Sequence, residues 1–432
     1  MTRRRAPFAL LSFIAAATLV ATRAQAGTVT TETQGARSVR VFTPTKPASP
    51  LPMVVMLHGC TQDPNGFADA TGMDAVAEEN GFVVVYPEQP ASVTPTKCWQ
   101  WWETANQARD AGEPKQLADA ISAIAAAKGV DAQRVYVAGL SAGGAMTTIL
   151  GATYPDRVAA IGVVAGLEYK ATTSFGGVLE ASSKGGPDPN VQADAAIAAM
   201  GVGARAMPAI VFQGTNDSVV AKVNGEQVAA MWLGVAARAL GAGAIDSPTP
   251  TSVTDGYPFT WSPHVVKAKA GASVVELYMI DGLGHAWPGG KAGGSYSDPK
   301  GPKASRALWK FFAGRTVAAP LDVAPPTPPA PGSSSSSSSS GGSTSGGSSS
   351  GGSSGSNEAP APNTDDAPAS TSDSGGCGVA ARSNSGAGGL SALCLLALLA
   401  WRRRERTREQ STAMEFRACS CTSRRGARRT RR

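Results

Sequence analysis

Histidine and cysteine are both scarce in this chain. Its 432 residues include three histidines and six cysteines. The closest cysteine pair, Cys419 and Cys421, has no histidine or second cysteine pair nearby, so a zinc site is not indicated. No nucleotide-binding motif is visible either. We therefore expect no metal and no cofactor, and any chemistry that needs a histidine has few candidates.

The body of the chain lacks a net positive charge. The formal net charge is +7, but the first 26 residues hold four arginines and no acidic residue, and residues 377–432 hold thirteen arginines and three glutamates. Residues 27–376 are left with a net charge of −7. This mildly acidic balance gives no indication of nucleic-acid binding. The basic ends instead indicate membrane-topology signals.

The first 26 residues have the pattern of a secretory signal peptide. A basic start at 3–5 precedes an apolar stretch over 6–21, and Ala24-Gln25-Ala26 fits the small-x-small cleavage rule. The alternative is a membrane anchor, but the apolar stretch is short for a span and Thr22-Arg23 interrupts it. We expect cleavage after Ala26 and a secreted protein.

The C-terminal part of the chain, residues 317–432, has a different composition. Segment 317–376 is rich in Pro, Ser and Gly and cannot bury enough apolar surface to fold, so it is predicted to be a disordered linker. In segment 377–404, an apolar stretch precedes Arg402–Arg404, which indicates a membrane anchor. The stretch is short for a span, and a loose hydrophobic tail is the alternative. Residues 405–432 form a basic tail of unknown role.

Residues 27–316 are predicted to form one domain of the α/β class. Short apolar runs bounded by turn residues predict strands, and apolar residues at helical spacing predict helices. Strands are expected as a hairpin over 28–42 and at 53–57, 81–86, 135–138, 158–165, 208–212, 265–269 and 274–280, with helices at 69–80, 114–128, from 144, 226–240 and 303–312. Their alternation predicts a mostly parallel central sheet with helices on both faces.

The sequence Gly139-Leu140-Ser141-Ala142-Gly143 lies between a predicted strand and a predicted helix. This G-x-S-x-G spacing is that of a nucleophile elbow, in which a sharp turn exposes the serine. An ordinary glycine-rich turn is the alternative. In an elbow, the backbone N–H of Ala142 lies at the start of the helix and is a candidate oxyanion donor.

Ser141 needs a base to take its proton, and in elbow folds the order along the chain is Ser, Asp or Glu, His. His58 precedes Ser141 and is excluded by that order. His264 lies ahead of a strand-like run and is interpreted as structural or surface-exposed. His285 lies in a glycine-rich loop just after a strand, where the base of a triad belongs, so His285 is the preferred candidate.

For the acid, Asp217 is preferred because it lies past the end of a strand, in Gly214-Thr-Asn-Asp217. Asp281, four residues before His285, is the alternative and could instead shape that loop. A second oxyanion donor is expected from the loop after the strand that ends at Leu57, which points to the backbone N–H of Cys60.

Cys60 and Cys98 are the two cysteines in the body of the chain. In an exported protein their expected fate is a disulfide, and two buried free thiols are the alternative. Such a bond draws the tryptophans after Cys98 towards the site. Core packing would account for them, but we expect Trp99 or Trp101 to line a substrate groove, with Trp287 as a further candidate.

The residues resemble the polyhydroxybutyrate depolymerase-type esterases within the α/β-hydrolases. The matching stretches are Leu57-His-Gly-Cys-Thr-Gln62, Cys98-Trp-Gln-Trp101, Gly139-Leu-Ser-Ala-Gly-Gly144, Gly214-Thr-Asn-Asp217 and Gly284-His-Ala-Trp-Pro-Gly289. The resemblance implies an α/β-hydrolase fold and ester hydrolysis through an acyl-enzyme. It implies Ser141 as nucleophile with Asp217 and His285, Cys60 at the oxyanion hole, and a Cys60–Cys98 bond.

That family also includes feruloyl and acetylxylan esterases, so the substrate does not follow. One departure is that no recognisable polymer-binding domain follows the linker. The C-terminus in turn resembles a myxobacterial sorting signal, with a Gly-Cys motif, an apolar helix and an Arg cluster. This implies processing near Cys377 by a sorting protease and attachment to the cell surface. The tail at 405–432 departs from that pattern.

The sequence therefore predicts a secreted, surface-tethered serine esterase that acts on a polymeric or oligomeric ester. It is expected to be a monomer and to meet the membrane only through its C-terminal anchor. Within the enzymes, a feruloyl or acetylxylan esterase and a peptidase on the same scaffold are alternatives. From another class, the alternative is a catalytically silent surface adhesin.

Overall fold

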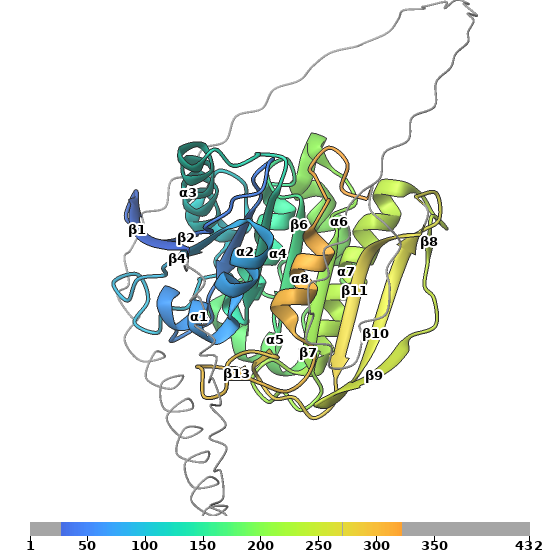
Figure 1. The fold of residues 1–432 in the computed structure, drawn as a ribbon. Coiled ribbons are helices and arrows are strands. Elements are labelled where there is room, and N and C mark those ends of the chain that lie inside the picture. The colour runs from blue at the N-terminus through green and yellow to red at the C-terminus, as the bar shows by residue number, and fades with distance from the viewer. Residues whose placement is uncertain (1–26, 270, 322–432) are drawn as a thin grey trace, which may run out of the picture. The chain divides into compact units, whose positions relative to one another are not determined.

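The computed structural model describes residues 27–269 and 271–321 (Figure 1). The predicted signal peptide, the C-terminal anchor, the basic tail and all but the first residues of the predicted linker lie outside these ranges. Among the described residues, no helix combines the length and the apolar character that a membrane span requires.

A large sheet organises the domain. In the described residues it has 11 strands in the order β1-β2-β4-β3-β5-β6-β7-β11-β10-β8, with β9 paired to β10. Its strands are β1 (Thr28–Gln34), β2 (Arg37–Thr43), β3 (Met53–Leu57), β4 (Val83–Pro87), β5 (Val135–Leu140), β6 (Ala160–Val164), β7 (Ala209–Gly214), β8 (Ile245–Asp246), β9 (Thr251–Asp255), β10 (Tyr257–Val266) and β11 (Ala272–Ile280). Pairing is parallel from β4 through β3, β5, β6 and β7 to β11, and antiparallel at both edges. The predicted mostly parallel sheet is confirmed.

Helices cover both faces of this sheet (Figure 1). The helices are α1 (Pro64–Thr71), α2 (Met73–Asn80), α3 (Gly112–Lys128), α4 (Ala142–Thr153), α5 (Val178–Lys184), α6 (Pro189–Met200), α7 (Lys222–Leu240) and α8 (Ala304–Phe312). Apolar residues of α1, α2 and α8 form one buried cluster with the sheet, and those of α3, α4, α6 and α7 form another.

The central strands are apolar throughout because both of their faces are buried. In β3, Met53, Val55 and Leu57 belong to the cluster on the α4 side, and Val54 and Met56 belong to the cluster on the α8 side. Successive side chains of a strand point to opposite faces, so a continuous apolar run satisfies two helical layers at once. This is why the central strands were predictable from sequence.

Two predicted elements are wrong in extent. The helix expected over 69–80 is two helices, α1 and α2, because Gly72 between them has a left-handed backbone with φ 63°. The strand expected at 265–269 is the end of β10, which begins at Tyr257. Pro258 and Pro263 obscure this strand in the sequence because proline cannot donate a ladder hydrogen bond.

The folded domain continues past the predicted boundary at residue 316. The N–H of Val317 donates to the carbonyl oxygen of Gln133 at 3.0 Å, and the N–H of Ala318 donates to Gln133 Oε1 at 2.9 Å. Leu321 is 5% exposed. The segment 317–321 therefore belongs to the domain rather than to the linker.

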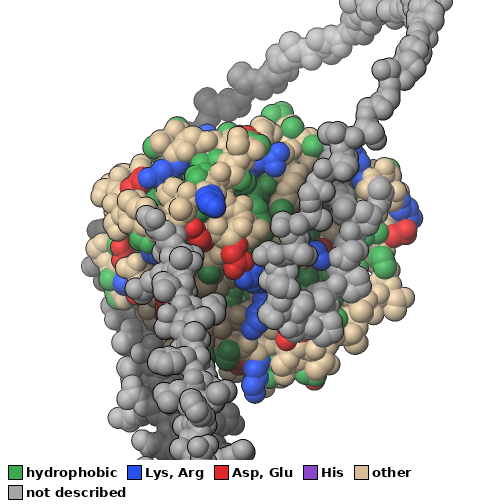
Figure 2. Space-filling model, in the orientation of Figure 1, with side chains coloured by type: hydrophobic (Ala, Val, Ile, Leu, Met, Phe, Trp, Pro, Cys, Tyr) green, Lys and Arg blue, Asp and Glu red, His purple; other side chains and the backbone are tan. Residues whose placement is uncertain are grey.

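Charges of both signs are interspersed on the visible part of the face drawn in Figure 2. Arg306 of α8 pairs with Glu79 of α2, with Nη1 2.6 Å from Oε2, and joins the two helices. Lys291 pairs with Asp69 of α1, with Nζ 2.6 Å from Oδ1. Exposed ion pairs of this kind contribute about 0–1 kcal/mol each to the free energy of unfolding, so they do not determine the fold.

Candidate active site

Several loops leave the sheet at the carboxyl ends of its parallel strands, β3, β5, β7 and β11. These ends lie along one edge of the sheet because the strands run in the same direction. The loops after them carry Cys60, Ser141, Asp217 and His285, respectively. The topology therefore gathers the predicted site residues at one edge.

Ser141 lies at the sharp turn between β5 and α4, with φ 59° and ψ −120°. A positive φ is unfavourable for serine, and such strain is found at functional turns. The flanking glycines permit the turn. A Cβ on Gly139 would lie 2.4 Å from the backbone of Gly143, and a Cβ on Gly143 would lie 2.1 Å from the carbonyl oxygen of Leu57. Any side chain at either position would clash with backbone.

The loop after β3, residues 58–62, packs against this turn and is called the Gly59 loop below. A Cβ on Gly59 would lie 3.5 Å from the Cβ of Ser141. The N–H of Gly59 donates to Gln62 Oε1 at 2.8 Å, but the N–H of Cys60 has no acceptor among the described residues. The N–H of Ala142, at the first position of α4, has no acceptor within the helix. Among the described residues, two backbone N–H groups without an acceptor therefore lie near Ser141: that of Ala142, which follows it in the sequence, and that of Cys60, in the loop packed against its turn.

His285 and Asp217 form a buried pair. His285 Nδ1 lies 2.8 Å from Asp217 Oδ2, and the two side chains are 5% and 0% exposed. Asp217 Oδ1 accepts from the N–H groups of Val219 and Val220, both at 2.9 Å. An ionised carboxylate only accepts hydrogen bonds, so the proton of the neutral imidazole is on Nδ1 and the lone pair of Nε2 is free.

The alternative histidine and acid have other partners. His264 lies on β10, where its Nδ1 is 2.8 Å from Ser247 Oγ. Asp281 Oδ1 accepts from Thr215 Oγ1 at 3.0 Å and so shapes the loop after β11. In the described part of the chain, no hydrogen bond joins Ser141 Oγ to His285.

A disulfide joins Cys60 to Cys98, with 4.2 Å between their Cα atoms. It ties the Gly59 loop to the long segment between β4 and α3. In the same region the N–H of Thr61 donates to the carbonyl oxygen of Thr96 at 2.6 Å. Cys60 is thus held through its side chain and through the peptide bond that follows it.

Removing this disulfide is expected to destabilise the domain. The bond closes a loop across a sequence separation of 38 residues. In the chain-entropy model, a loop of this size contributes about 3–4 kcal/mol to the free energy of unfolding. Urea unfolding of the Cys60→Ala/Cys98→Ala variant measures the loss, and wild-type protein under reducing conditions should unfold at the same midpoint. A loss below about 1 kcal/mol would contradict the expectation.

The prediction that Trp99, Trp101 and Trp287 line a substrate groove is wrong. These residues are 0%, 4% and 0% exposed, so none of them presents a ring face to a ligand. The Trp99 Nε1–H donates to the carbonyl oxygen of His58 at 3.0 Å, and the Trp287 Nε1–H donates to Ser305 Oγ at 3.2 Å. Because their indole N–H groups are satisfied inside the protein, Trp99 and Trp287 act as core residues, and Trp101 is buried in the same apolar cluster as Trp99.

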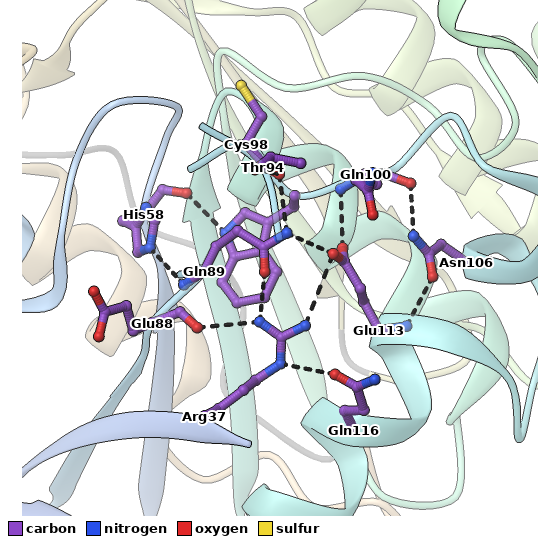
Figure 3. Close-up of polar contacts among 11 residues, drawn as sticks. Arg37, His58, Glu88, Gln89, Thr94, Cys98, Gln100, Asn106, Glu113 and Gln116 are labelled. Atoms are coloured by element: carbon purple, nitrogen blue, oxygen red, sulfur yellow. Dashed lines mark hydrogen bonds and ion pairs between the residues drawn. The ribbon is translucent and has the colours of Figure 1, made fainter. Parts of the chain in front are cut away.

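A buried polar cluster includes His58 of the Gly59 loop and was not predicted from the sequence (Figure 3). It consists of Arg37, Gln89 and Glu113, together with His58. Arg37 Nη1 donates to Gln89 Oε1, and Arg37 Nη2 lies 3.8 Å from Glu113 Oε1. Burial lowers the pKa of Arg37 and raises that of Glu113, and it lowers the pKa of His58 to about 4. His58 is therefore neutral at neutral pH.

Gln62 is a further residue that joins parts of the site. Its Oε1 accepts from the N–H of Gly59, and its Nε2 donates to the carbonyl oxygen of Ser295 at 2.8 Å. Ser295 precedes Tyr296, whose ring meets the ring of His285 edge-on at a centroid distance of 5.8 Å. Gln62 is in the Leu57–Gln62 motif, which gave the only sequence signal for it.

Glu168, in the loop after β6, is a buried acid without a partner. It is 2% exposed, and neither carboxylate oxygen has a hydrogen-bond partner among the described residues. Burial raises the pKa of Glu168 to about 8, and the charge of Asp188 adds to this shift. Between pH 4.5 and about 8 the folded protein keeps a proton that the unfolded chain releases, so stability falls as pH rises through this window.

The variant Glu168→Gln is expected to remove this pH dependence. The unfolding free energy of the variant relative to the wild type should rise by about 4 kcal/mol from pH 4.5 to pH 8. Urea unfolding of both proteins across this range is the measurement. A difference between the two proteins that is the same at both ends of the range would show that Glu168 does not titrate as its burial indicates.

The sheet order, the elbow at Ser141 and the His285–Asp217 pair together define an α/β-hydrolase. The solved structure of an acetyl xylan esterase from Aspergillus awamori has the same fold, with a TM-score of 0.53 and 21% identity over 66% of this chain and 99% of that one. Residues 38–248 match the family model described as esterase PHB depolymerase.

Two curated relatives carry the comparison further. The chain is 33% identical over 239 residues to poly(3-hydroxyalkanoate) depolymerase C of Paucimonas lemoignei, covering 55% of each chain. It is 30% identical over 261 residues to poly(3-hydroxybutyrate) depolymerase of Ralstonia pickettii, covering 58% of this chain and 51% of that one. Over its folded domain the chain is therefore similar to the polyhydroxybutyrate depolymerase-type esterases. It spans about half the length of these relatives.

Proposed function

We propose that the protein is a serine esterase that hydrolyses carboxylic esters, with a polyester of hydroxyalkanoic acids as the preferred substrate class. The observation that carries the proposal is the buried His285–Asp217 pair, on the same sheet edge as the strained Ser141 turn. A plain glycine-rich turn does not require such a pair. The match to the family model supports the same reaction, and the names of the two relatives support the substrate class.

In the proposed reaction, Ser141 Oγ attacks the ester carbonyl carbon and its proton passes to His285 Nε2. The carbonyl oxygen gains negative charge and accepts from the N–H groups of Cys60 and Ala142. His285 then gives the proton to the leaving alcohol oxygen, and the acyl group stays on Ser141. Water, deprotonated by His285, attacks the acyl-enzyme and releases the carboxylic acid. Asp217 holds the imidazole in the tautomer that leaves Nε2 free.

Two local features support these roles. Nδ1 of His285 is occupied by Asp217 Oδ2, which directs Nε2 towards the substrate side. In the part of the chain that the structure describes, the N–H groups of Cys60 and Ala142 have no acceptor, whereas the N–H of Gly59 donates to Gln62 Oε1. The direct Ser141–His285 hydrogen bond is expected to form in the substrate complex, since catalytic hydrogen bonds often tighten only there.

Hydrolysis by the purified protein tests the proposal. We expect turnover of a p-nitrophenyl butyrate solution and clearing of a polyhydroxybutyrate suspension. We also expect covalent labelling of Ser141 by a fluorophosphonate probe. A protein that neither turns over the ester nor reacts with the probe would instead be the silent adhesin. Cleavage of a peptide panel in preference to the ester panel would favour a peptidase.

Acetylated or feruloylated xylan is the second substrate class. The fold match to an acetyl xylan esterase motivates it but shows the fold alone. Release of acetate or ferulate from these xylans, measured beside monomer release from polyhydroxybutyrate, decides between the two. A kcat/KM at least tenfold higher on either xylan would replace the polyester as the proposed substrate.

We also propose that the protein is secreted, is attached to the cell surface through segment 377–404 after processing by a sorting protease, and is a monomer. The Cys60–Cys98 disulfide supports export, because such bonds persist in oxidising compartments. Cell fractionation of the tagged protein tests this localisation. Recovery of the full-length chain with residues 1–26 in the cytosol would contradict it.

A further inference from the structure

Gln89 joins four segments that are distant in the sequence (Figure 3). It follows the end of β4 and is 0% exposed. Its N–H donates to His58 Nε2 at 3.1 Å, and its side-chain Nε2 donates to the carbonyl oxygen of Cys98 at 3.0 Å and to Glu113 Oε1. Its Oε1 accepts from Arg37 Nη1. Each polar atom of Gln89 that points into this region therefore has a partner.

The contact with His58 reaches the peptide unit of Cys60. Because His58 Nε2 accepts from Gln89, the neutral ring carries its proton on Nδ1, and Nδ1 lies 2.8 Å from the carbonyl oxygen of Gly59. That oxygen and the N–H of Cys60 belong to the same planar peptide bond. Fixing one end of the plane therefore fixes the direction of the other.

The rest of the buried polar cluster keeps Gln89 in place. Glu113, in the first turn of α3, accepts from the N–H of Gln100 through Oε2 at 2.9 Å. Arg37 Nε donates to Gln116 Oε1 at 3.1 Å, and its guanidinium lies over the ring of Trp99 at 4.9 Å. The buried charges of Arg37 and Glu113 compensate each other, and removing either residue would leave the other as an uncompensated buried charge. The pair therefore holds the two groups that bind the Gln89 side chain.

We propose that Gln89 is a positioning residue for ester hydrolysis. Its buried side chain holds its backbone N–H against His58, and His58 in turn aims the N–H of Cys60 at the developing oxyanion. This inference rests on the proposed function and adds to it a residue that lies outside the motifs of the sequence analysis. Gln89 does not touch the substrate. Its effect is on the stabilisation of the transition state, so a change at Gln89 lowers kcat and leaves KM nearly unchanged.

The test exchanges donor and acceptor between Gln89 and Glu113. Gln89→Glu places a second carboxylate next to that of Glu113. It also removes the side-chain N–H groups that donate to Glu113 Oε1 and to the carbonyl oxygen of Cys98. The expected result is a fall in kcat of about 10- to 100-fold for p-nitrophenyl butyrate with KM within about threefold, since the loss of a whole oxyanion donor costs about 10²–10³. Affinity for an alkylboronic acid, which mimics the tetrahedral intermediate, should fall by the same factor as kcat.

The double variant Gln89→Glu/Glu113→Gln restores the pairing with the roles exchanged. Its glutamate accepts from Arg37, and its glutamine donates to that glutamate while still accepting from the N–H of Gln100. The carbonyl oxygen of Cys98 keeps its bond from Thr94 Oγ1. We expect the double variant to recover most of the kcat that Gln89→Glu loses.

Tyr136→Phe is the matched control for a purely structural loss. The Tyr136 hydroxyl is buried at the amino end of β5 and donates to the carbonyl oxygen of Arg315 at 2.6 Å. This variant should lower the thermal unfolding midpoint and leave kcat and KM unchanged. If Gln89→Glu does not fold, Gln89→Met, which keeps the length without a charge, takes its place.

The outcomes separate the two proposals. Wild-type turnover with an unchanged kcat in the Gln89 variants would overturn the positioning role alone. A double variant that recovers its unfolding midpoint but not its kcat would overturn it too. A wild-type protein that neither hydrolyses the ester nor reacts with the fluorophosphonate probe would overturn the proposed function, and the positioning role with it.

Discussion

Ser141→Ala is expected to lower kcat for p-nitrophenyl butyrate by about 10⁵- to 10⁶-fold, the cost of removing the nucleophile of a serine hydrolase. Alanine has no atom that can form the acyl-enzyme, and it fits the turn no worse than serine. The fold should therefore survive. The fluorophosphonate probe should fail to label the variant. The thermal unfolding midpoint should stay within a few degrees of the wild-type value.

Ser122→Ala is the matched control for this substitution. The Ser122 hydroxyl lies on α3 and donates to the carbonyl oxygen of Ala118 at 2.8 Å. The same chemical change at this position should leave both turnover and labelling at the wild-type level. A Ser141→Ala protein that keeps more than about a hundredth of the wild-type kcat would sink the assignment of Ser141 as nucleophile.

Local sequence carries enough information to predict the elbow. The glycines at 139 and 143 are required by close backbone contacts within the turn and with the end of β3. Those contacts follow from the turn itself, so the spacing is visible in five residues. The central strands were predictable for a similar reason, because burial on both faces leaves a continuous apolar run such as Met53–Leu57.

Side chains whose role depends on distant partners were not predictable in the same way. Trp99 follows a cysteine of the disulfide, which suggested a place in the site, but Arg37 from β2 lies over its ring and the carbonyl oxygen of His58 accepts from its indole. The residues around Trp99 in the sequence give no indication that an arginine from β2 covers its ring. Gln89 and Glu113 are similar, because each is an ordinary polar residue until the fold brings Arg37 between them.

The pairing of His285 leads to the second large prediction. Asp217→Asn is expected to lower kcat by about 10⁴-fold, the cost of presenting the wrong histidine tautomer in a triad. The amide oxygen can still accept from the N–H groups of Val219 and Val220, so the turn keeps its geometry. The amide nitrogen then faces Nδ1 as a donor. This favours the tautomer with the proton on Nε2, which can no longer take the proton of Ser141.

Asp281→Asn provides the comparison, because Asp281 is the other acid near His285 in the sequence. Its partner is Thr215 Oγ1, and an asparagine oxygen can accept the same bond. We expect kcat within about threefold of the wild-type value for this variant, since it does not touch the imidazole and surface changes of this kind have small effects. Steady-state kinetics of the two variants on one ester decide between the acids. A large loss in Asp281→Asn together with a small loss in Asp217→Asn would transfer the acid role to Asp281, and the buried His285–Asp217 bond would then serve only to fix the loop.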